Sequence, residues 1–266
     1  MKIVVCVKQV PEVTNVQVDP VTGTLIREGV KSILNPFCEY ALDHAVRIAR
    51  AMEHVQIYAV TMGPPQAKDV LMHCLELGAN QGFLVTDRKF AGADTWATAF
   101  TLSKVIRLVV PDFDLILVGK QAIDGDTAQV GPELAEILGL PQITYGIEVI
   151  PSSKKKYIRV KQEVEQGYEV VEAALPVLVT FSKGETMRRA PSFLDVVAAR
   201  KKPIHVVKAS DLDLSEESLG LKGSFTQVIK VFPPPQKKSS RVIQNVEAAT
   251  AAQEIYSFLK EKRFLI

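Results

Sequence analysis

Short apolar runs alternate with longer amphipathic segments over the first two thirds of the chain. The runs stand at residues 3–7, 55–62, 82–86, 114–118 and 175–181, and the first is rich in β-branched residues. Runs of this length and composition are typical of strands that are buried on both faces of a parallel sheet. We therefore predict a mostly parallel sheet built from these segments.

The segments between the runs have helical spacing. Helices are expected from residue 36 onward and at 66–77, 94–109 and 127–138. Asn35 is expected to cap the first helix, Pro36 suits its first position, and Asp94 is expected to cap the third helix. Strands that alternate with helices of this length form right-handed βαβ units, so the sequence predicts an α/β, Rossmann-like parallel sheet.

The pattern changes near Pro151. Two segments of alternating polarity, 157–165 and 168–174, flank Gln166 and Gly167 and predict an antiparallel β-hairpin. After about residue 184 the periodicity weakens and prolines recur, until a terminal amphipathic helix is expected at 245–262. An irregular stretch of this length suits an arm that wraps a partner chain. We predict an α/β domain at 1–184, with the hairpin at 157–174, and an extended C-terminal arm at 185–266.

Composition excludes several classes of protein. Apolar residues make up 47% of the 266 residues, and 32 basic residues nearly balance 30 acidic ones. A near-neutral chain gives no reason to expect nucleic acid as a partner. Short basic clusters at 154–156, 200–202 and 237–238 are interpreted as solvated faces, although the second could also steer an acidic surface. No apolar window approaches the roughly 18 residues of a membrane span, so no membrane insertion is expected.

Cysteines and histidines indicate no catalytic or metal site. Cys6, Cys38 and Cys74 form an odd set without paired spacing, which argues against disulfides and zinc and favours a reducing cytoplasm. The four histidines are scattered and form neither a ligand pair nor a catalytic triad. We predict no catalytic side chain and no metal ligand, and we interpret Cys6 and Cys38 as buried, inert thiols.

Residues 119–132 carry the candidate chemistry, because they follow a buried strand and precede a helix. Ligands of open α/β sheets bind at this edge. Gly125 would let the backbone approach a ligand closely, and Thr127 and the first amides of the helix could bind a diphosphate. The alternative is a simple helix cap at Asp126 or Thr127. The stretch is neither a G-x-G-x-x-G fingerprint nor a P-loop, so spacing alone leaves both readings open.

Four segments, in order, resemble the beta subunit of electron transfer flavoproteins, the family that includes the FixA proteins. They are Val5-Cys6-Val7-Lys8-Gln9-Val10-Pro11, Asn35-Pro36-Phe37-Cys38-Glu39, Gly119-Lys120-Gln121-Ala122-Ile123-Asp124-Gly125-Asp126, and Val160-Lys161-Gln162-Glu163-Val164-Glu165-Gln166-Gly167 followed by Leu175-Pro176-Val177-Leu178-Val179-Thr180. Together they cover nearly the whole chain. The resemblance implies a fold of the adenine nucleotide alpha hydrolase type. A nucleotide sensor related to universal stress proteins is disfavoured, because its G-x₂-G-x₉-G spacing is missing.

The resemblance implies a nucleotide site, with Cys6 near the adenine and residues 119–130 around the phosphates. The matching positions are Cys6, Asn35, Pro36, Phe37, Cys38, Met62, Gly119, Gln121, Ala122, Asp124, Gly125, Asp126, Thr127, Ala128, Gln129 and Val130. In simple carriers of this family the occupant is AMP. In electron-bifurcating members it is FAD, with NADH docking nearby. Gly125 resembles the second group, so FAD is expected here and AMP is the alternative.

The resemblance also implies partners. These are a larger alpha subunit with its own FAD, a flavin-dependent dehydrogenase acting on acyl-CoA or a hydroxyacid, and ferredoxin or flavodoxin as the second acceptor. Residues 189–202 resemble the loop that recognises the dehydrogenase, and Phe193 takes the position of its apolar anchor, beside Leu194. The alternative is that Phe193 and Leu194 cover the chain's own core.

Overall fold

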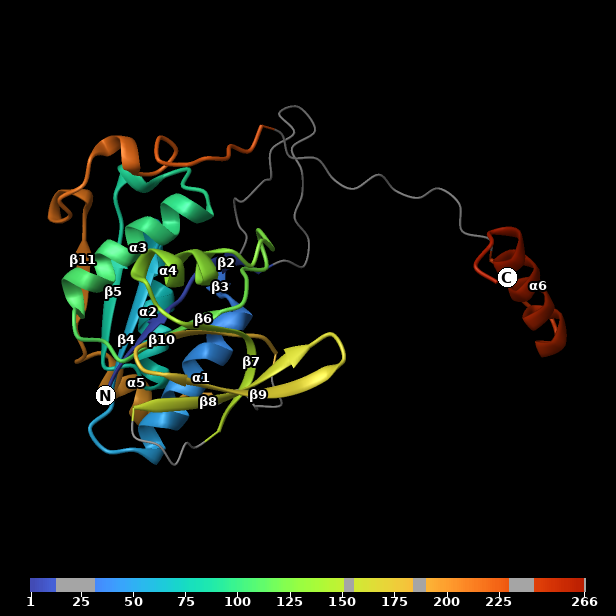
Figure 1. The fold of residues 1–266 in the computed structure, drawn as a ribbon, viewed down its shortest axis with the longest axis horizontal. Helices are drawn as coiled ribbons and strands as arrows, with labels where there is room; N and C mark the ends of the chain where they lie inside the picture. Colours follow the sequence, from blue (N-terminus) through green and yellow to red (C-terminus); the bar gives the residue numbers. More distant parts are fainter. Residues whose placement is uncertain (13–31, 151–155, 184–189, 230–241, 266) are drawn as a thin grey trace.

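The computed structural model describes residues 1–12, 32–150, 156–183, 190–229 and 242–265, and its architecture confirms the predicted α/β class (Figure 1). One sheet of nine strands has the order β11-β5-β4-β1-β6-β10-β7-β8-β9. Its parallel strands are β1 (Lys2–Cys6), β4 (Gln56–Met62), β5 (Gln81–Val85), β6 (Leu115–Gly119), β7 (Gln142–Ile150), β10 (Val177–Phe181) and β11 (Ile204–Val207). A separate antiparallel pair joins β2 (Gln9–Pro11) to β3 (Ser32–Leu34).

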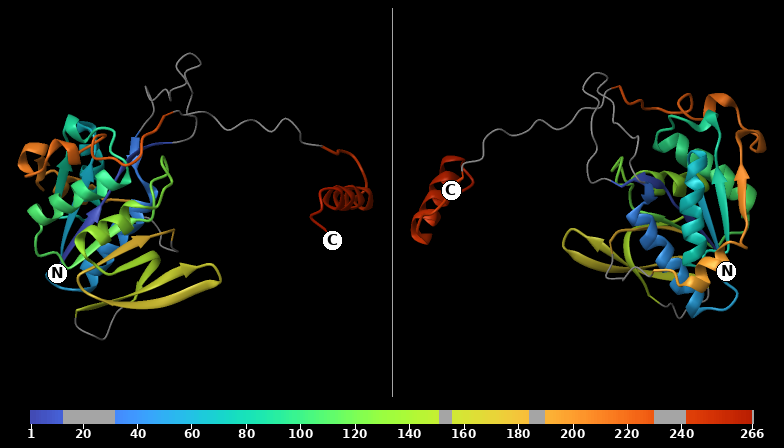
Figure 2. Two further views of the ribbon diagram at one scale, coloured as in Figure 1. Left: turned by 45° about the horizontal axis from the view of Figure 1, so that its top comes forward. Right: turned by 180° about the vertical axis from the view of Figure 1, so that it is seen from behind.

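Helices cover both faces of the parallel strands (Figures 1 and 2). They are α1 (Pro36–Ala51), α2 (Lys68–Leu77), α3 (Thr95–Val109) and α4 (Val130–Leu138), followed later by α5 (Phe193–Ala199). The last helix, α6 (Ala248–Glu261), does not cover the sheet. Ile3 and Val5 of β1 pack into the core on the side of α1 and α2, whereas Val4 and Cys6 pack on the side of α3 and α4. This alternation explains why the strand is apolar at every position.

The predicted hairpin is confirmed as β8 (Tyr157–Val164) and β9 (Gly167–Ala174), which pair antiparallel and extend the sheet beyond β7. The sequence pattern had not predicted β7. Its register with β8 shifts between Gly146 and Glu148. Such a shift interrupts the alternation of apolar and polar positions by which a strand is recognised.

Part of the chain beyond the expected boundary at residue 184 still packs on the α/β domain. Residues 204–207 join the sheet as β11, in parallel with β5. Lys202 precedes this strand and donates hydrogen bonds from its Nζ to the carbonyl oxygens of Leu75 and Ala79, at 2.8 and 2.7 Å. The solvated reading of the basic cluster 200–202 is therefore wrong for Lys202. The clusters at 154–156 and 237–238 lie wholly or partly outside the described residues.

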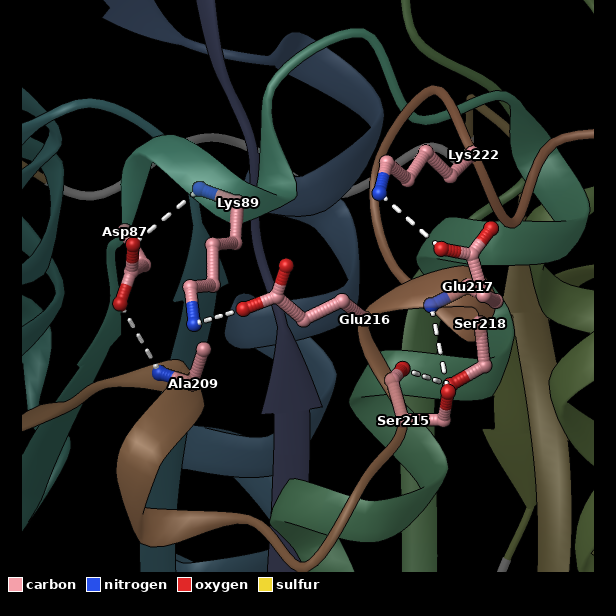
Figure 3. Close-up of polar contacts among 8 residues, drawn as sticks. All are labelled: Asp87, Lys89, Ala209, Ser215, Glu216, Glu217, Ser218 and Lys222. Carbon is pink, nitrogen blue, oxygen red and sulfur yellow. Dashed lines mark hydrogen bonds and ion pairs between the residues drawn. The ribbon is translucent and has the colours of Figure 1, made fainter.

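Residues 208–222 are held at the carboxyl end of β5 (Figure 3). The carboxylate of Asp87 accepts hydrogen bonds from the backbone N–H of Lys89 and of Ala209, at 3.1 and 3.2 Å, and Lys89 pairs with Glu216. Further along, the carboxylate of Asp94 accepts a hydrogen bond from the backbone N–H of Thr226 at 2.9 Å. The following helix, α6, has no buried residue and stands apart from the sheet in both figures (Figures 1 and 2). Its amphipathic face has no partner within the described chain.

Candidate functional site

The residues predicted for the nucleotide site meet at the carboxyl edge of the sheet. β1 lies between β4 and β6, and Cys6 is in register with Val60 and Val118. From β1 the chain builds the sheet first toward β4 and β5 and then, on the other side, toward β6 and β10. Such a reversal of strand order opens the crevice in which open α/β sheets bind ligands. Cys6 and Gly119 are the last residues of the two strands at this reversal, and Met62 ends β4 next to them.

Close packing brings the start of α1 to the same point. A Cβ at Gly119 would lie 2.7 Å from the backbone nitrogen of Cys38 and 2.7 Å from the carbonyl carbon of Phe37. Only glycine permits this approach of helix and strand end. Cys6 and Cys38 are buried, and burial raises the pKa of the Cys6 thiol to about 12 and raises that of Cys38 as well. Both thiols therefore stay protonated near neutral pH, as expected for packing residues.

The side chain of Asn35 does not cap α1, contrary to the sequence prediction. Its Nδ2 donates a hydrogen bond to the carbonyl oxygen of Gln121 at 2.8 Å, and its Oδ1 accepts one from the backbone N–H of Ile123 at 3.2 Å. The side-chain amide of Asn35 thus bonds the loop after β6 and not the N-terminal backbone amides of α1. Asn35 joins two segments of the site that lie far apart in the sequence.

The loop at residues 120–129 has two further ties. The ammonium of Lys8 pairs with the carboxylate of Asp124, and the side chain of Gln121 donates a hydrogen bond to that of Asp126. A turn is closed by the backbone N–H of Asp126, which donates to the carbonyl oxygen of Ala122 at 2.8 Å. Residues 124–127 are nevertheless exposed. The loop is therefore anchored at its base and open to solvent at its tip.

The helix α4 begins at Val130 and not at residue 127, so the predicted helix start is wrong. Asp126 and Ala128 adopt left-handed backbone conformations, with φ of +57° and +56°, which cannot belong to a right-handed helix. The residue before the helix is Gln129, and its side chain makes no capping hydrogen bond. Neither Asp126 nor Thr127 is the cap, so the simple capping interpretation of this motif is also wrong.

This conformation leaves the backbone amides of residues 127–131 without a hydrogen-bond partner among the described residues. The left-handed Ala128 is followed by Gln129 in the right-handed region, with φ of −100° and ψ of −33°. Alternating conformations of this kind turn successive N–H groups toward one point and form an anion-binding concavity. The positive end of the α4 dipole adds to the attraction. The donor set fits a diphosphate.

Two glycines of the motif differ in their surroundings. A Cβ at Gly125 would meet no heavy atom within 4 Å, so the space beside this residue is open. A Cβ at Gly131 would lie 2.6 Å from Cγ2 of Thr180 and 3.0 Å from Cγ2 of Val118. Gly131 therefore allows α4 to sit directly on β6 and β10. Gly125 is free to face a ligand.

Lys120 supplies a cation that the sequence analysis did not single out. Its Nζ lies 5.2 Å from the ring centroid of Phe37 and 5.1 Å from that of Tyr145. No ion pair among the described residues involves Lys120, and ring faces stabilise a cation without neutralising it. Lys8, Lys120 and Tyr145 all lie at the candidate site. Lys8 and Lys120 stand inside the quoted segments, whereas no sequence signal marks Tyr145.

Phe193 and Leu194 lie away from the loop at 120–129. They begin α5, whose N-terminus is fixed by mutual hydrogen bonds between Ser192 and Asp195. Because α5 precedes β11, and β11 runs parallel to β5, this helix lies toward the amino edge of the sheet. Phe193 is 80% exposed and Leu194 is 76% exposed, so they do not cover the chain's own core. That alternative is wrong.

Residues 1–12, 32–150, 156–183, 190–229 and 242–265 contain neither a cluster of three or more His, Cys, Asp or Glu that could hold a metal ion nor a helix of the length and apolarity that a bilayer requires. Arg189, at the start of the segment that resembles the recognition loop, lies outside these residues.

Comparisons with known proteins agree with the resemblance. Residues 22–212 match the electron transfer flavoprotein domain. The caffeyl-CoA reductase-Etf complex subunit CarD of Acetobacterium woodii is 44% identical over 265 residues, which cover 100% of both chains. The electron transfer flavoprotein subunit beta of Megasphaera elsdenii is 44% identical over 249 residues, with 92% of each chain covered. Protein FixA of Azotobacter vinelandii is 41% identical over 251 residues, covering 92% of this chain and 89% of its own.

Proposed function

Because this chain belongs to the beta subunit and FixA family of electron transfer flavoproteins, we propose that it binds FAD at the carboxyl edge of its sheet and takes part in electron bifurcation. It acts as one half of a heterodimer with an alpha subunit that carries its own FAD. NADH is the electron donor. The acceptors are ferredoxin or flavodoxin and a dehydrogenase for an acyl-CoA or a hydroxyacid.

The observation that supports a dinucleotide is the row of backbone amides at residues 127–131, which the described protein leaves unpaired. Buried or ligand-facing amides require acceptors, and a diphosphate supplies several at once. Lys120 adds a positive charge that the ring faces of Phe37 and Tyr145 hold near the base of the loop. Cys6 and Met62, at the ends of β1 and β4, provide an apolar floor on which an adenine can rest.

The open space beside Gly125 favours FAD over AMP. With no heavy atom within 4 Å of a Cβ at this position, the loop tip leaves room for a ligand that continues past its first phosphate. When bound, FAD supplies the redox chemistry, taking two electrons from NADH and releasing them singly toward the two acceptors. The chain's own part is to bind the diphosphate, to orient the ligand and to leave the loop tip open.

Counting nucleotides tests this function. We expect the heterodimer, purified with its alpha subunit and then denatured, to release a second FAD in addition to the FAD of the alpha subunit. Release of AMP in its place would show a simple carrier, in which AMP is structural. ATP without flavin would point to a nucleotide sensor. A heterodimer that releases no adenine compound beyond the FAD of the alpha subunit would contradict the proposed site.

A kinetic experiment tests bifurcation separately. Oxidation of NADH by the heterodimer should require both the dehydrogenase with its substrate and ferredoxin or flavodoxin. If either acceptor alone supports the full rate, the two electrons are not divided, and only the carrier function survives.

A bulky side chain at residue 125 tests the position of the ligand. Gly125→Ala adds a Cβ in open space and should leave both fold and nucleotide content unchanged, whereas Gly125→Leu should lower nucleotide content because it fills the path of the ligand. Equal nucleotide content in the two variants would place the ligand elsewhere.

A further inference from the structure

Asn35 is a buried polar residue next to the loop at residues 120–129. It is 1% exposed and stands between β3 and the first residue of α1. Its backbone N–H donates a hydrogen bond to the carbonyl oxygen of Lys8 at 2.9 Å, which ties it to the residue that pairs with Asp124. A buried amide must satisfy its donors and its acceptor within the protein.

The side-chain amide of Asn35 forms hydrogen bonds with the loop and with its own helix. Nδ2 donates one hydrogen bond to the carbonyl oxygen of Gln121 at 2.8 Å and another to Sγ of Cys38 at 3.2 Å. Oδ1 accepts from the backbone N–H of Ile123 at 3.2 Å. A carboxamide has two N–H donors and one carbonyl oxygen. Both donors and an acceptor position are therefore engaged before any ligand is considered.

These two contacts resemble the hydrogen bonds that a neighbouring β-strand would make with the loop backbone. Asn35 offers a donor to the carbonyl of residue 121 and an acceptor to the N–H of residue 123, which fixes the backbone between them. The turn that follows, closed by Ala122 and Asp126, leads directly into the left-handed Asp126 and Ala128. The direction of the free amides at 127–131 thus depends on where Asn35 holds the start of the loop.

We propose that Asn35 is a positioning residue, which acts on the bound nucleotide through the loop at 121–123 and not by touching the ligand. The inference rests on the proposed function, because it concerns the same site. Among the ties of the loop, the Lys8–Asp124 pair is partly exposed, with 47% and 29% of the side chains accessible. Exposed pairs contribute little, whereas a buried hydrogen bond that loses one partner leaves an unsatisfied group at a larger cost.

Two substitutions separate the contacts. Asn35→Asp keeps an acceptor for the N–H of Ile123 but loses the donor to Gln121 and sets a carboxylate against its carbonyl oxygen. Asn35→Ala removes both contacts. Asn80→Ala is a matched control, because Oδ1 of Asn80 accepts from the backbone N–H of Ile57 at 2.7 Å, at the amino end of β4.

The experiment measures AMP and FAD binding to the nucleotide-stripped heterodimer by calorimetry, together with amide hydrogen exchange of Ile123. Both Asn35 variants should bind about tenfold more weakly or worse, which corresponds to about 1.4 kcal/mol per factor of ten. The amide of Ile123 should exchange faster in Asn35→Ala. Asn80→Ala should keep wild-type affinity and wild-type exchange at Ile123.

Three outcomes would overturn the inference. Wild-type affinity in Asn35→Ala would show that the loop does not need this amide. An equal loss in Asn80→Ala would show a general effect on the fold. Weakened binding with unchanged exchange at Ile123 would mean that Asn35 touches the ligand directly. If the wild-type heterodimer binds neither nucleotide, the proposed function fails as well, which distinguishes that failure from a failure of Asn35 alone.

Discussion

The ammonium of Lys8 lies 2.7 and 2.9 Å from the two carboxylate oxygens of Asp124, although 116 positions separate them in the sequence. Lys8 follows β1, and Asp124 lies in the exposed tip of the loop after β6. The pair therefore joins the segments that follow β1 and β6, the two strands between which the strand order reverses. It also neutralises a carboxylate that would otherwise repel the phosphates of a nucleotide.

Lys8→Met should weaken nucleotide binding by about two- to fivefold, because an exposed pair is worth at most about 1 kcal/mol. The loss should shrink at high salt, which screens the freed Asp124 carboxylate. Titration of AMP and FAD at two ionic strengths measures both effects. Lys2→Met is the matched control, since Lys2 pairs with Asp112 at 2.7 Å, next to the amino ends of β1 and β6. Adding Asp124→Asn should restore part of the affinity. No recovery would show that charge is not the cause.

Gly131→Ala should destabilise the protein by about 1–3 kcal/mol, as expected for an added methyl group in a packed interior. The new Cβ would lie 2.6 Å from Cγ2 of Thr180, so α4 would have to move off the sheet. Chemical denaturation of the nucleotide-free protein measures the loss. Gly125→Ala, in open space, serves as the control and should stay within about 0.5 kcal/mol of wild type. Similar losses in both variants would contradict the packing argument.

His44 should make the free energy of unfolding depend on pH. Its ring stacks on Phe181, with centroids 4.2 Å apart, and its Nε2 has no partner among the described residues. Burial, assisted by the charge of Arg47, lowers the pKa of His44 to about 4, and a hydrogen bond with Ile147 opposes the shift only in part. The unfolded chain, with a pKa near 6.5, then binds the proton more readily than the folded chain.

Stability from this depressed pKa is fully present above about pH 6.5 and is lost as the pH falls toward 4, by roughly 3 kcal/mol in all. Denaturation between pH 4 and 7 should show this slope in the wild type. It should be reduced in His44→Gln, which cannot take up the proton. His73, on α2 and only partly buried, is the control, and His73→Gln should keep the slope. An unchanged slope in His44→Gln would assign it to other groups.

Phe193→Ala should slow electron transfer to the dehydrogenase and leave nucleotide content unchanged. Phe193 is 80% exposed on α5, toward the edge of the sheet opposite the loop at residues 120–129. A large aromatic side chain in this setting suits an anchor that enters a pocket of a partner. Steady-state rates at several dehydrogenase concentrations measure the effect, which should fall on apparent affinity. Leu221→Ala, at a residue 48% exposed near Gly92, is a control outside α5. Loss of flavin in Phe193→Ala would show a structural role.

The parallel core was predictable because its strands are buried on both faces and are therefore apolar at every position. The strands at the edges of the sheet were less predictable from the sequence. β11 has only four residues and is partly exposed, and the bulge at Gly146 breaks the pattern of β7. Short or interrupted strands give little periodicity to read, and their place is set by contacts with distant segments.

Apart from Tyr145, the members of the candidate site followed from their resemblance to the family, but some of their local roles did not. Asn35 has the residue type and position of a helix cap, yet its side chain bonds a loop 86 positions away. Asp126 and Thr127 have the same local signal, yet the left-handed backbone at Asp126 and Ala128 delays α4 to Val130. Propensity rules describe neighbours in sequence, and here tertiary hydrogen bonds prevail over them.

With Gly131 seated against β6 and β10, α4 is fixed to the sheet before any ligand arrives. The helix therefore stays in place, and we expect the backbone at residues 120–129 to accommodate entry and escape of a nucleotide at the proposed site. Because Asp126 and Ala128 already occupy the left-handed region within that stretch, we expect the rate of nucleotide exchange to depend on a local backbone rearrangement and not on opening of the whole domain.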